Sequence, residues 1–262
     1  MGRPVALVTG ASSGLGDVFA HHLANRGYDL ILVARRGERL RALAAELSTG
    51  VQVLVADLST NEGILAVERA MTSCIDLELL VNNAGFGTVG RYWEADVEEQ
   101  QRMYIVHVLA VAGLTRAALR AMVPRGRGAV INVASVAAFG QSAGNVSYCS
   151  TKAWMTSFTV GLDVELRSID SPVKVQALCP GFTATEFHAT LFHNTRGDGR
   201  QGIPGFLWLD PDFVVEKSLD ALEGGRKPVV VPGLLYKIVV FLMKHLPGGL
   251  TRNVRPGNKD RV

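Results

Sequence analysis

The stretch Pro4-Val5-Ala6-Leu7-Val8-Thr9-Gly10-Ala11-Ser12-Ser13-Gly14-Leu15-Gly16 predicts a strand, a glycine turn and the start of a helix. Gly10 can take a positive φ, Gly14 lets a bulky anion approach the backbone, and Gly16 lets the helix pack closely. The helix start offers free N–H groups and a partial positive charge, which suit a pyrophosphate. The spacing Gly-x-x-x-Gly-x-Gly departs from the common Gly-x-Gly-x-x-Gly fingerprint, and an ordinary glycine-rich turn has the same composition.

Working outward from this stretch, further apolar runs predict buried strands, and helical patterns lie between most of them. Continuous apolar strands separated by crossover helices imply a parallel sheet covered on both faces, with ligands beyond the carboxyl ends of the strands. We therefore expect a doubly wound α/β fold of about seven strands. The strands after Pro4–Val8 are predicted at Tyr28–Ala34, Val51–Ala56, Leu77–Asn82, Ala129–Ala134, Val173–Cys179 and Pro228–Val231.

The composition fits one large domain over residues 1–262, because 48% hydrophobic content can bury a core of that size. A net charge of +3 is mild, and no aromatic and basic stripe suggests nucleic acid. The chain opens almost directly on a strand, so we expect no secretory signal and a cytoplasmic protein. Cys74, Cys149 and Cys179 have no Cys-x-x-Cys spacing, so neither a metal site nor a disulfide framework is indicated.

Tyr148 and Lys152 are four residues apart, which places them on one face of a helix. A phenol loses its proton near pH ~10, and a nearby ammonium group favours the phenolate. One charge at ~4 Å in an effective dielectric of ~20 contributes about 4 kcal/mol, comparable with the shift of ~3 pKa units that neutrality requires. The pair could therefore form a catalytic acid, although this spacing alone also arises by chance in many helices.

The glycine turn, Asn82-Asn83-Ala84-Gly85, Ser135, Tyr148-x-x-x-Lys152 and Pro180-Gly181 occur in the order seen in the short-chain dehydrogenase/reductase family. The chain resembles this family over nearly its whole length. The resemblance implies a Rossmann-type fold and hydride transfer between a nicotinamide and a carbonyl or alcohol carbon, with Tyr148 as general acid or base. It also implies that Lys152 hydrogen-bonds the nicotinamide ribose and that Ser135 donates to the substrate oxygen.

The resemblance further implies a set of contacts along the bound coenzyme. The glycine turn would hold the pyrophosphate, Asp57 and Leu58 would lie beside the adenine, and the loop after Pro180 would close over the nicotinamide. The complete expected set, besides Tyr148, Lys152 and two arginines considered next, is Gly10, Ser12, Ser13, Gly14, Leu15, Gly16, Asp57, Leu58, Asn83, Ala84, Gly85, Pro180, Gly181, Thr183 and Thr185.

The end of the second predicted strand indicates which coenzyme is used. An enzyme that uses NAD would usually place an acidic residue there, but this chain has Ala34, Arg35 and Arg36. Guanidinium groups at this position suit a 2′-phosphate, which a carboxylate would repel, so NADP(H) is preferred over NAD(H). The alternative is that the two arginines are solvated residues at the start of a helix over Gly37–Leu47.

One position departs from the family pattern. The predicted helix Gln100–Met122 places His107 where the family motif Asn-x-x-Gly begins, and Ala110 replaces its glycine. In many relatives that asparagine helps to hold a water that relays protons from the lysine toward solvent. A neutral imidazole can also donate and accept hydrogen bonds, so His107 is a candidate fourth catalytic residue. Alternatively, backbone carbonyls satisfy His107 and it has no relay function.

The segment 187–213 is expected to determine the substrate. Its apolar residues would form a lid that favours a hydrophobic carbonyl or alcohol, such as a lipophilic ketone, a steroid-like alcohol or an acyl chain. The same residues could equally form a subunit interface. They are Phe187, Leu191, Phe192, Phe206, Leu207 and Trp208.

The segment 233–262 combines an apolar surface with basic residues. It is too short and too charged to span a bilayer, but it could rest on an anionic membrane surface. We favour packing in a homodimer or homotetramer, which is common in the family. The chain as a whole is predicted to be an NADP(H)-dependent oxidoreductase, and the alternative is a catalytically silent NADP(H)-binding protein with a redox-sensing or scaffold role.

Overall fold

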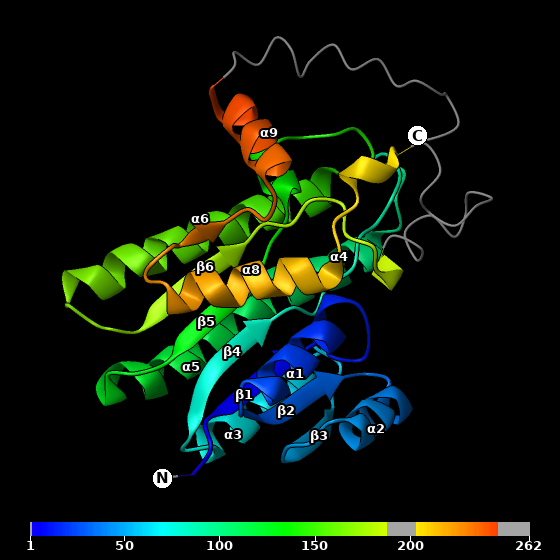
Figure 1. Ribbon diagram of the computed structural model, residues 1–262. Helices are drawn as coiled ribbons and strands as arrows, with labels where there is room; N and C mark the ends of the chain where they lie inside the picture. Colours follow the sequence, from blue (N-terminus) through cyan, green and yellow to red (C-terminus); the bar gives the residue numbers. More distant parts are fainter. Residues whose placement is uncertain (1, 188–202, 246–262) are drawn as a thin grey trace.

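A parallel β-sheet forms the centre of the computed structural model, which describes residues 2–187 and 203–245 (Figure 1). The sheet has seven strands in the order β3-β2-β1-β4-β5-β6-β7, and this confirms the predicted doubly wound α/β fold. Each predicted strand is present, with small shifts at its ends. The strands are β1 Val5–Thr9, β2 Asp29–Ala34, β3 Val51–Val55, β4 Leu77–Asn82, β5 Ala129–Val133, β6 Lys174–Leu178 and β7 Val229–Val230.

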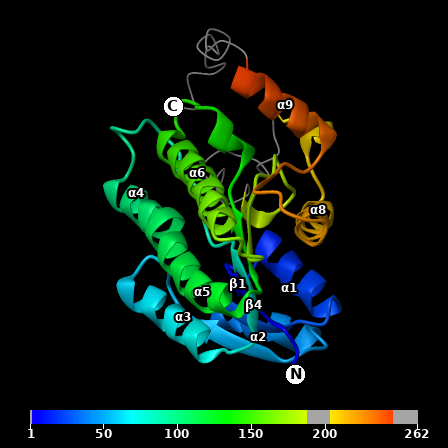
Figure 2. The same ribbon diagram turned by 90° about the vertical axis from the view of Figure 1, so that its left-hand side faces the viewer.

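Helices cover both faces of the sheet, and each face has a large hydrophobic core, with a third, smaller cluster around Met155 and Cys179 (Figure 2). On one face α1, α2 and α8 contribute Phe19, Leu40 and Val214. On the other face α3, α5 and α6 contribute Val67, Leu114 and other apolar residues. The helices are α1 Leu15–Asn25, α2 Gly37–Glu46, α3 Asn61–Ser73, α4 Val97–Tyr104, α5 Val111–Arg125, α6 Val146–Ser168, α8 Pro211–Glu223 and α9 Leu234–His245.

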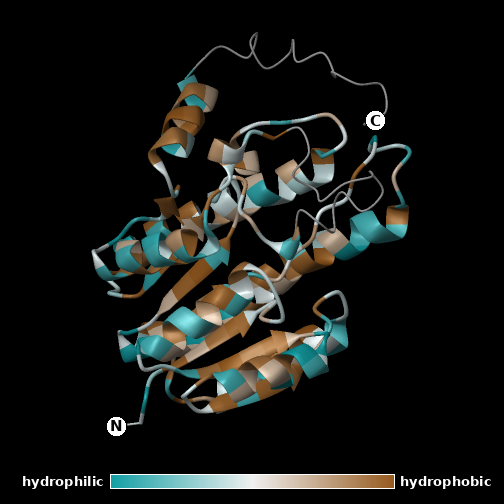
Figure 3. Ribbon diagram, turned by 45° about the vertical axis from the view of Figure 1, so that its right-hand side comes forward, coloured by the Kyte–Doolittle hydropathy of each residue, from teal (hydrophilic) through white to brown (hydrophobic). Residues whose placement is uncertain are grey.

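The central strands are buried on both faces, which explains why they form continuous apolar runs in the sequence (Figure 3). All five residues of β5 are buried. Two asparagines interrupt this apolar surface near the carboxyl edge, where Asn82 Nδ2 donates to Asn132 Oδ1 at 2.8 Å and to Thr115 Oγ1 at 3.0 Å. Asn132 Nδ2 donates in turn to Thr159 Oγ1 at 2.9 Å, so the network ties the ends of β4 and β5 to α5 and α6.

The helical run Val97–Arg125 consists of α4, a π-helical turn over Ile105–Ala110 and α5. It is long and apolar enough to cross a membrane, and it is the one such run in the described part of the chain. Its apolar side chains have another explanation, because Leu114, Ala118 and Met122 are completely buried against the sheet. Within this fold the run is a core helix.

Candidate active site

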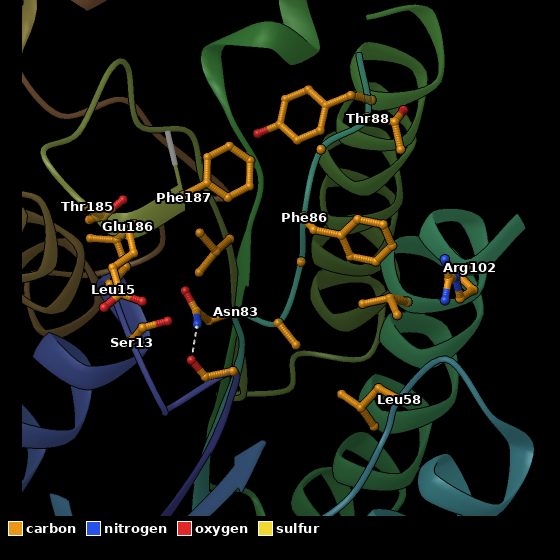
Figure 4. A pocket seen from close by; sticks show the side chains of 18 of the residues that line it. Ser13, Leu15, Leu58, Asn83, Phe86, Thr88, Arg102, Thr185, Glu186 and Phe187 are labelled. Atoms are coloured by element: carbon orange, nitrogen blue, oxygen red, sulfur yellow. Dashed lines mark hydrogen bonds between the residues drawn. The ribbon is translucent and has the colours of Figure 1, made fainter. Parts of the chain in front are cut away.

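A cleft of about 870 Å³ opens beyond the carboxyl ends of the strands (Figure 4). It is lined by nearly every residue that the sequence assigned to coenzyme and catalysis, including the glycine turn, both arginines, Ser135, Tyr148 and Lys152. Gly16 and His107 do not line it. Chain segments that are far apart in sequence therefore meet at one edge of the sheet, as the parallel topology predicts.

The glycine turn and the start of α1 form the centre of the cleft. Gly10 and Gly14 have φ values of 67° and 61°, a left-handed conformation that residues with a Cβ rarely adopt. No side chain caps the N-terminus of α1, whereas Thr60, Asp96 and Asp210 cap α3, α4 and α8. The first N–H groups of α1 are thus left for a ligand, and this arrangement fits the pyrophosphate of a dinucleotide.

Gly16 and Asn83 support the glycine turn from behind. A Cβ on Gly16 would lie 2.3 Å from Gly10 O and 2.5 Å from Asn83 Nδ2, so only glycine fits there. Asn83 Nδ2 donates to Thr9 O at 2.9 Å and to Gly10 O at 3.3 Å. The backbone N–H groups of Asn83 and Ala84 donate to Thr9 Oγ1. The side chain of Asn83 therefore holds the turn in shape.

Arg36 stands at the adenosine end of the cleft and is held by several partners. Its Nη2 donates to Ser13 Oγ at 2.6 Å and to Ser12 O at 3.3 Å, and its Nε donates to Ser12 Oγ at 3.1 Å. Its Nη1 lies 3.5 Å from a carboxylate oxygen of Glu186. Arg35 is exposed at the same edge. These two cations can receive a 2′-phosphate, with Arg36 already oriented for it.

Asp57 and Leu58 line the opposite wall of the adenosine end, where Arg102 of α4 also points into the cleft (Figure 4). Burial acts to raise the pKa of Asp57, but hydrogen bonds from the Ser59 backbone and side chain, together with the charges of Arg35 and Arg102, outweigh it and lower that pKa. Sequence reasoning missed Arg102, because it stands on an exposed turn of a helix and belongs to no motif.

Lys152 is buried on α6 below the cleft and is 4% exposed. Its Nζ donates to Val133 O at 2.7 Å, at the end of β5, and lies 5.7 Å from the centroid of the Tyr148 ring. Burial lowers the pKa of Lys152 to about 8. The tie to Val133 fixes the ammonium group next to Tyr148, as the helical spacing predicted.

The Tyr148 side chain reaches the cleft, which Ser135 also lines. Burial raises the pKa of Tyr148 to about 12, the Ser135 hydrogen bond opposes this rise, and the nearby thiols of Cys149 and Cys179 add to it. Lys152 is not among these causes, so our expectation that the ammonium group makes the phenol acidic is wrong for the protein alone. Desolvation is the largest cause, because the phenol is buried and burial disfavours its charged form.

His107 is completely buried in the π-helical turn, beneath the loop that follows β4. Its Nε2 accepts from the Phe86 N–H at 3.2 Å, and its Nδ1 lies 2.9 Å from Thr151 Oγ1. Because Thr151 Oγ1 donates its own proton to Tyr148 O, Nδ1 must be the donor to Thr151. Burial and the charge of Lys152 hold the pKa of His107 well below its usual value, so the ring stays neutral.

Both nitrogens of His107 are thus occupied, and the ring joins the coenzyme loop to the helix that carries Tyr148. A Cβ on Gly85 would lie 2.7 Å from His107 Nε2, so the imidazole also explains the glycine at that position. These contacts favour the second reading of His107, a positioning residue without a relay function. Its part in catalysis stays a prediction.

The loop after β6 passes over the cleft and is anchored from α9. A Cβ on Gly181 would lie 2.0 Å from the Tyr236 ring, so this glycine leaves room for Tyr236. Tyr236 Oη accepts from the Phe182 N–H at 3.0 Å and donates to Leu207 O at 2.6 Å. Tyr236 belongs to the segment 233–262, for which the sequence predicted an apolar surface, and this anchoring role was missed.

The predicted lid over 187–213 falls into separate parts. The Phe187 ring lies in the cleft, with its centroid 5.9 Å from that of Tyr148. Phe206 is 75% exposed, and the rings of Trp208 and Phe182 are in contact, but neither Phe206 nor Trp208 lines the cleft. Leu191 and Phe192 lie outside the described residues, as does the end of the basic segment after residue 245.

This combination of a parallel sheet, an uncapped helix behind a glycine turn, and a buried Tyr–Lys pair defines a dinucleotide-dependent oxidoreductase. The short chain dehydrogenase family model matches residues 4–196, which is most of the chain. The chain therefore belongs to the short-chain dehydrogenase/reductase family.

Individual relatives agree with this assignment. An NADP-dependent 3-hydroxy acid dehydrogenase of Salmonella typhimurium is 36% identical over 218 residues, which cover 81% of this chain and 86% of that protein. A short-chain dehydrogenase from Sphingobium yanoikuyae, solved in complex with NADPH, is 32% identical with a TM-score of 0.79 and covers 97% of this chain and 98% of that one. A bulky-bulky ketone specific alcohol dehydrogenase from Comamonas testosteroni is 27% identical with a TM-score of 0.79, at 97% and 96% coverage.

Proposed function

We propose that this protein interconverts a hydrophobic ketone or aldehyde and the corresponding alcohol, with Tyr148 as the general acid and base. The observation that carries this proposal is the convergence of Tyr148, Ser135 and Lys152 on one end of the dinucleotide cleft. A pure binding protein has no evident use for a buried lysine fixed beside a tyrosine that reaches the ligand space.

The coenzyme is NADP(H). Two arginines stand at the adenosine end, where an enzyme that uses NAD would place a carboxylate. The Ser12 and Ser13 side chains hold the fork of Arg36 in an orientation that suits a phosphate. The named coenzymes of the Salmonella and Sphingobium proteins agree with this assignment.

When it is bound, the nicotinamide coenzyme supplies or accepts the hydride. In reduction, Tyr148 gives its hydroxyl proton to the substrate oxygen, and its pKa of about 12 keeps that proton in place at neutral pH. Ser135 hydrogen-bonds the same oxygen as negative charge develops. Lys152, whose ammonium group is fixed by Val133 O and lies 5.7 Å from the centroid of the Tyr148 ring, would hydrogen-bond the nicotinamide ribose, as the family resemblance implies.

An aromatic wall beside Tyr148 supports a hydrophobic substrate. Phe187 and Phe86 line the cleft on either side of the catalytic end (Figure 4). Such a wall favours an apolar group on the carbonyl carbon over a small polar sugar. The bulky ketones named for the Comamonas enzyme suit this wall.

A panel of ketones and alcohols of increasing size, assayed with NADPH or NADP⁺ at the nicotinamide absorbance, tests this function. We expect turnover that rises with the hydrophobic area of the substrate. Tyr148→Phe is the matched control, since it removes one oxygen and preserves the ring. Complete inactivity of the wild type over the whole panel, with coenzyme binding intact, would instead favour the silent coenzyme-binding protein.

We further propose that the exposed apolar face of α9 packs against a second copy of the chain. Leu234, Ile238 and Phe241 of this helix are 74%, 48% and 59% exposed, which is unusual for residues of this size. Light scattering after gel filtration should therefore give a dimer or tetramer, and Phe241→Glu should reduce its mass. A monomer that sediments with anionic liposomes at low salt would identify α9 as a membrane contact instead.

A further inference from the structure

A carboxylate and two arginines form a cluster at the rim of the cleft. Arg39 Nη1 contacts both carboxylate oxygens of Glu186, at 3.0 Å and 2.9 Å, and Arg36 Nη1 lies 3.5 Å from Oε2. The arginines belong to the segment after β2, whereas Glu186 follows β6, about 150 residues later in the chain. The cluster therefore joins two distant segments of the chain on one side of the cleft.

The two residues that flank Glu186 in the chain lie beside other parts of the cleft. Thr185 comes next to the glycine turn, since a Cβ on Gly14 would lie 3.4 Å from it. Phe187 contacts the ring of Tyr148. Figure 4 shows Glu186 beside Thr185, Leu15 and Ser13, on the side of the cleft away from Arg102. Glu186 therefore lies between the residue next to the glycine turn and the residue next to Tyr148.

We propose that Glu186 is a coenzyme-discriminating residue, whose carboxylate occupies Arg36 and Arg39 until a 2′-phosphate replaces it. A carboxylate and a phosphate are competing acceptors for the same guanidinium fork. A 2′-hydroxyl carries no charge and cannot displace the carboxylate, so NAD(H) leaves the cluster closed. The inference rests on the proposed use of NADP(H), and it adds a residue from the segment after β6 to the selection of that coenzyme.

The charges make competition the expected outcome. Arg36, Arg39 and Glu186 have side chains that are 45%, 51% and 55% exposed, so the ion pairs are weak enough to exchange for a ligand. While Glu186 is paired with the two arginines, its negative charge repels a 2′-phosphate that approaches them. The wild-type affinity for a 2′-phosphate is then the net result of attraction by the arginines and competition by Glu186.

Calorimetry with two fragments of the adenosine end tests the inference without turnover. The probes are 2′,5′-ADP and 5′-AMP, and the proteins are the wild type, Glu186→Gln and Glu216→Gln. Glu216 is exposed on α8 outside the cleft and gives the same change of net charge. At low salt we expect Glu186→Gln to bind 2′,5′-ADP about threefold to tenfold more tightly than the wild type, with unchanged binding of 5′-AMP. The Glu216→Gln variant should behave as the wild type.

Unchanged or weaker binding of 2′,5′-ADP by Glu186→Gln would overturn the inference, and so would an equal gain for 5′-AMP. A wild type that prefers 2′,5′-ADP over 5′-AMP supports the NADP(H) assignment whatever the variant does. A wild type without that preference would refute the coenzyme assignment and the inference with it. A thermal melt of each variant verifies that it is folded before titration.

Discussion

The two ends of the cleft use charge in opposite ways. At the catalytic end Lys152 is buried, bonded to the Val133 carbonyl, and held by a long helix and a central strand. At the adenosine end Arg36 and Arg39 are about half exposed and share one loop carboxylate, Glu186. Charges are strong and fixed at the first end, and they are screened and exchangeable at the second.

This contrast shows why a proton-transfer site uses buried side chains and a phosphate site uses exposed ones. Burial shifts pKa values, as it does for Tyr148 and Lys152, and rigid elements keep donor and acceptor aligned. A phosphate must enter and leave, so its ligands are exposed cations whose pairing with the protein is reversible. Substitutions should accordingly have large effects at the catalytic end and small, salt-dependent effects at the adenosine end.

The largest effect is expected at Tyr148. Tyr148→Phe should lower kcat by about 10³-fold or more, because it removes the only proposed proton donor to the substrate oxygen. Its affinity for 2′,5′-ADP should be unchanged, since the adenosine end is distant from the ring. Steady-state kinetics and calorimetry measure the two quantities. Residual activity near that of the wild type would reject Tyr148 as the acid.

Lys152→Met should lower kcat by about 10²-fold and also change how stability depends on pH. The pKa of Lys152 is about 8 in the folded protein and 10.5 in its ordinary state. Between these values the unfolded chain binds a proton that the folded protein does not, so the free energy of unfolding rises with pH across this window. The rise from this group is on the order of 3 kcal/mol and should be absent in the variant.

Urea unfolding of the coenzyme-free protein at pH 7.5 and pH 10 measures this difference. Other groups titrate in the same range, so the informative quantity is the wild-type change minus the change in Lys152→Met. Equal changes in the free energy of unfolding of the two proteins would mean that burial does not destabilise the Lys152 ammonium group.

A smaller effect is expected at the arginine rim. Arg36→Gln should weaken 2′,5′-ADP binding about tenfold at low salt and considerably less at high salt, because the side chain is nearly half exposed. Arg35→Asp should weaken it too and shift preference toward NAD(H), since a carboxylate repels the 2′-phosphate. If Arg36→Gln no longer prefers 2′,5′-ADP over 5′-AMP while Arg35→Asp still does, Arg36 alone would bind the 2′-phosphate.

The smallest effect on chemistry is expected at His107. His107→Asn should reduce kcat only several-fold and leave the shape of its pH profile unchanged, because the imidazole stays neutral and both its nitrogens are occupied. Stability should fall by about 1–3 kcal/mol, since the partly buried Phe86 N–H loses its acceptor. A pH profile that moves in the variant would restore His107 as part of a proton relay.

The fold could be predicted from the sequence almost entirely. Each strand is a short apolar run bounded by turns, and β5 shows this most clearly because all its residues are buried. The coenzyme residues were assigned largely through the family resemblance, and the parallel strands explain why these residues meet at one edge. Arg102, Glu186 and Tyr236 escaped prediction, because each acts through a neighbour that is distant in the chain and belongs to no local pattern.

Strand periodicity and the glycine turn determined the fold class, and the ordered motifs that resemble the short-chain dehydrogenase/reductase family indicated the kind of chemistry. These are local properties, set by backbone conformation and by which side chains share a helix face. Tertiary structure alone decided that burial raises the pKa of Tyr148, that both nitrogens of His107 are bonded, and that Glu186 meets Arg36. Desolvation and pairing depend on segments brought together from across the chain, and no spacing within one segment encodes them.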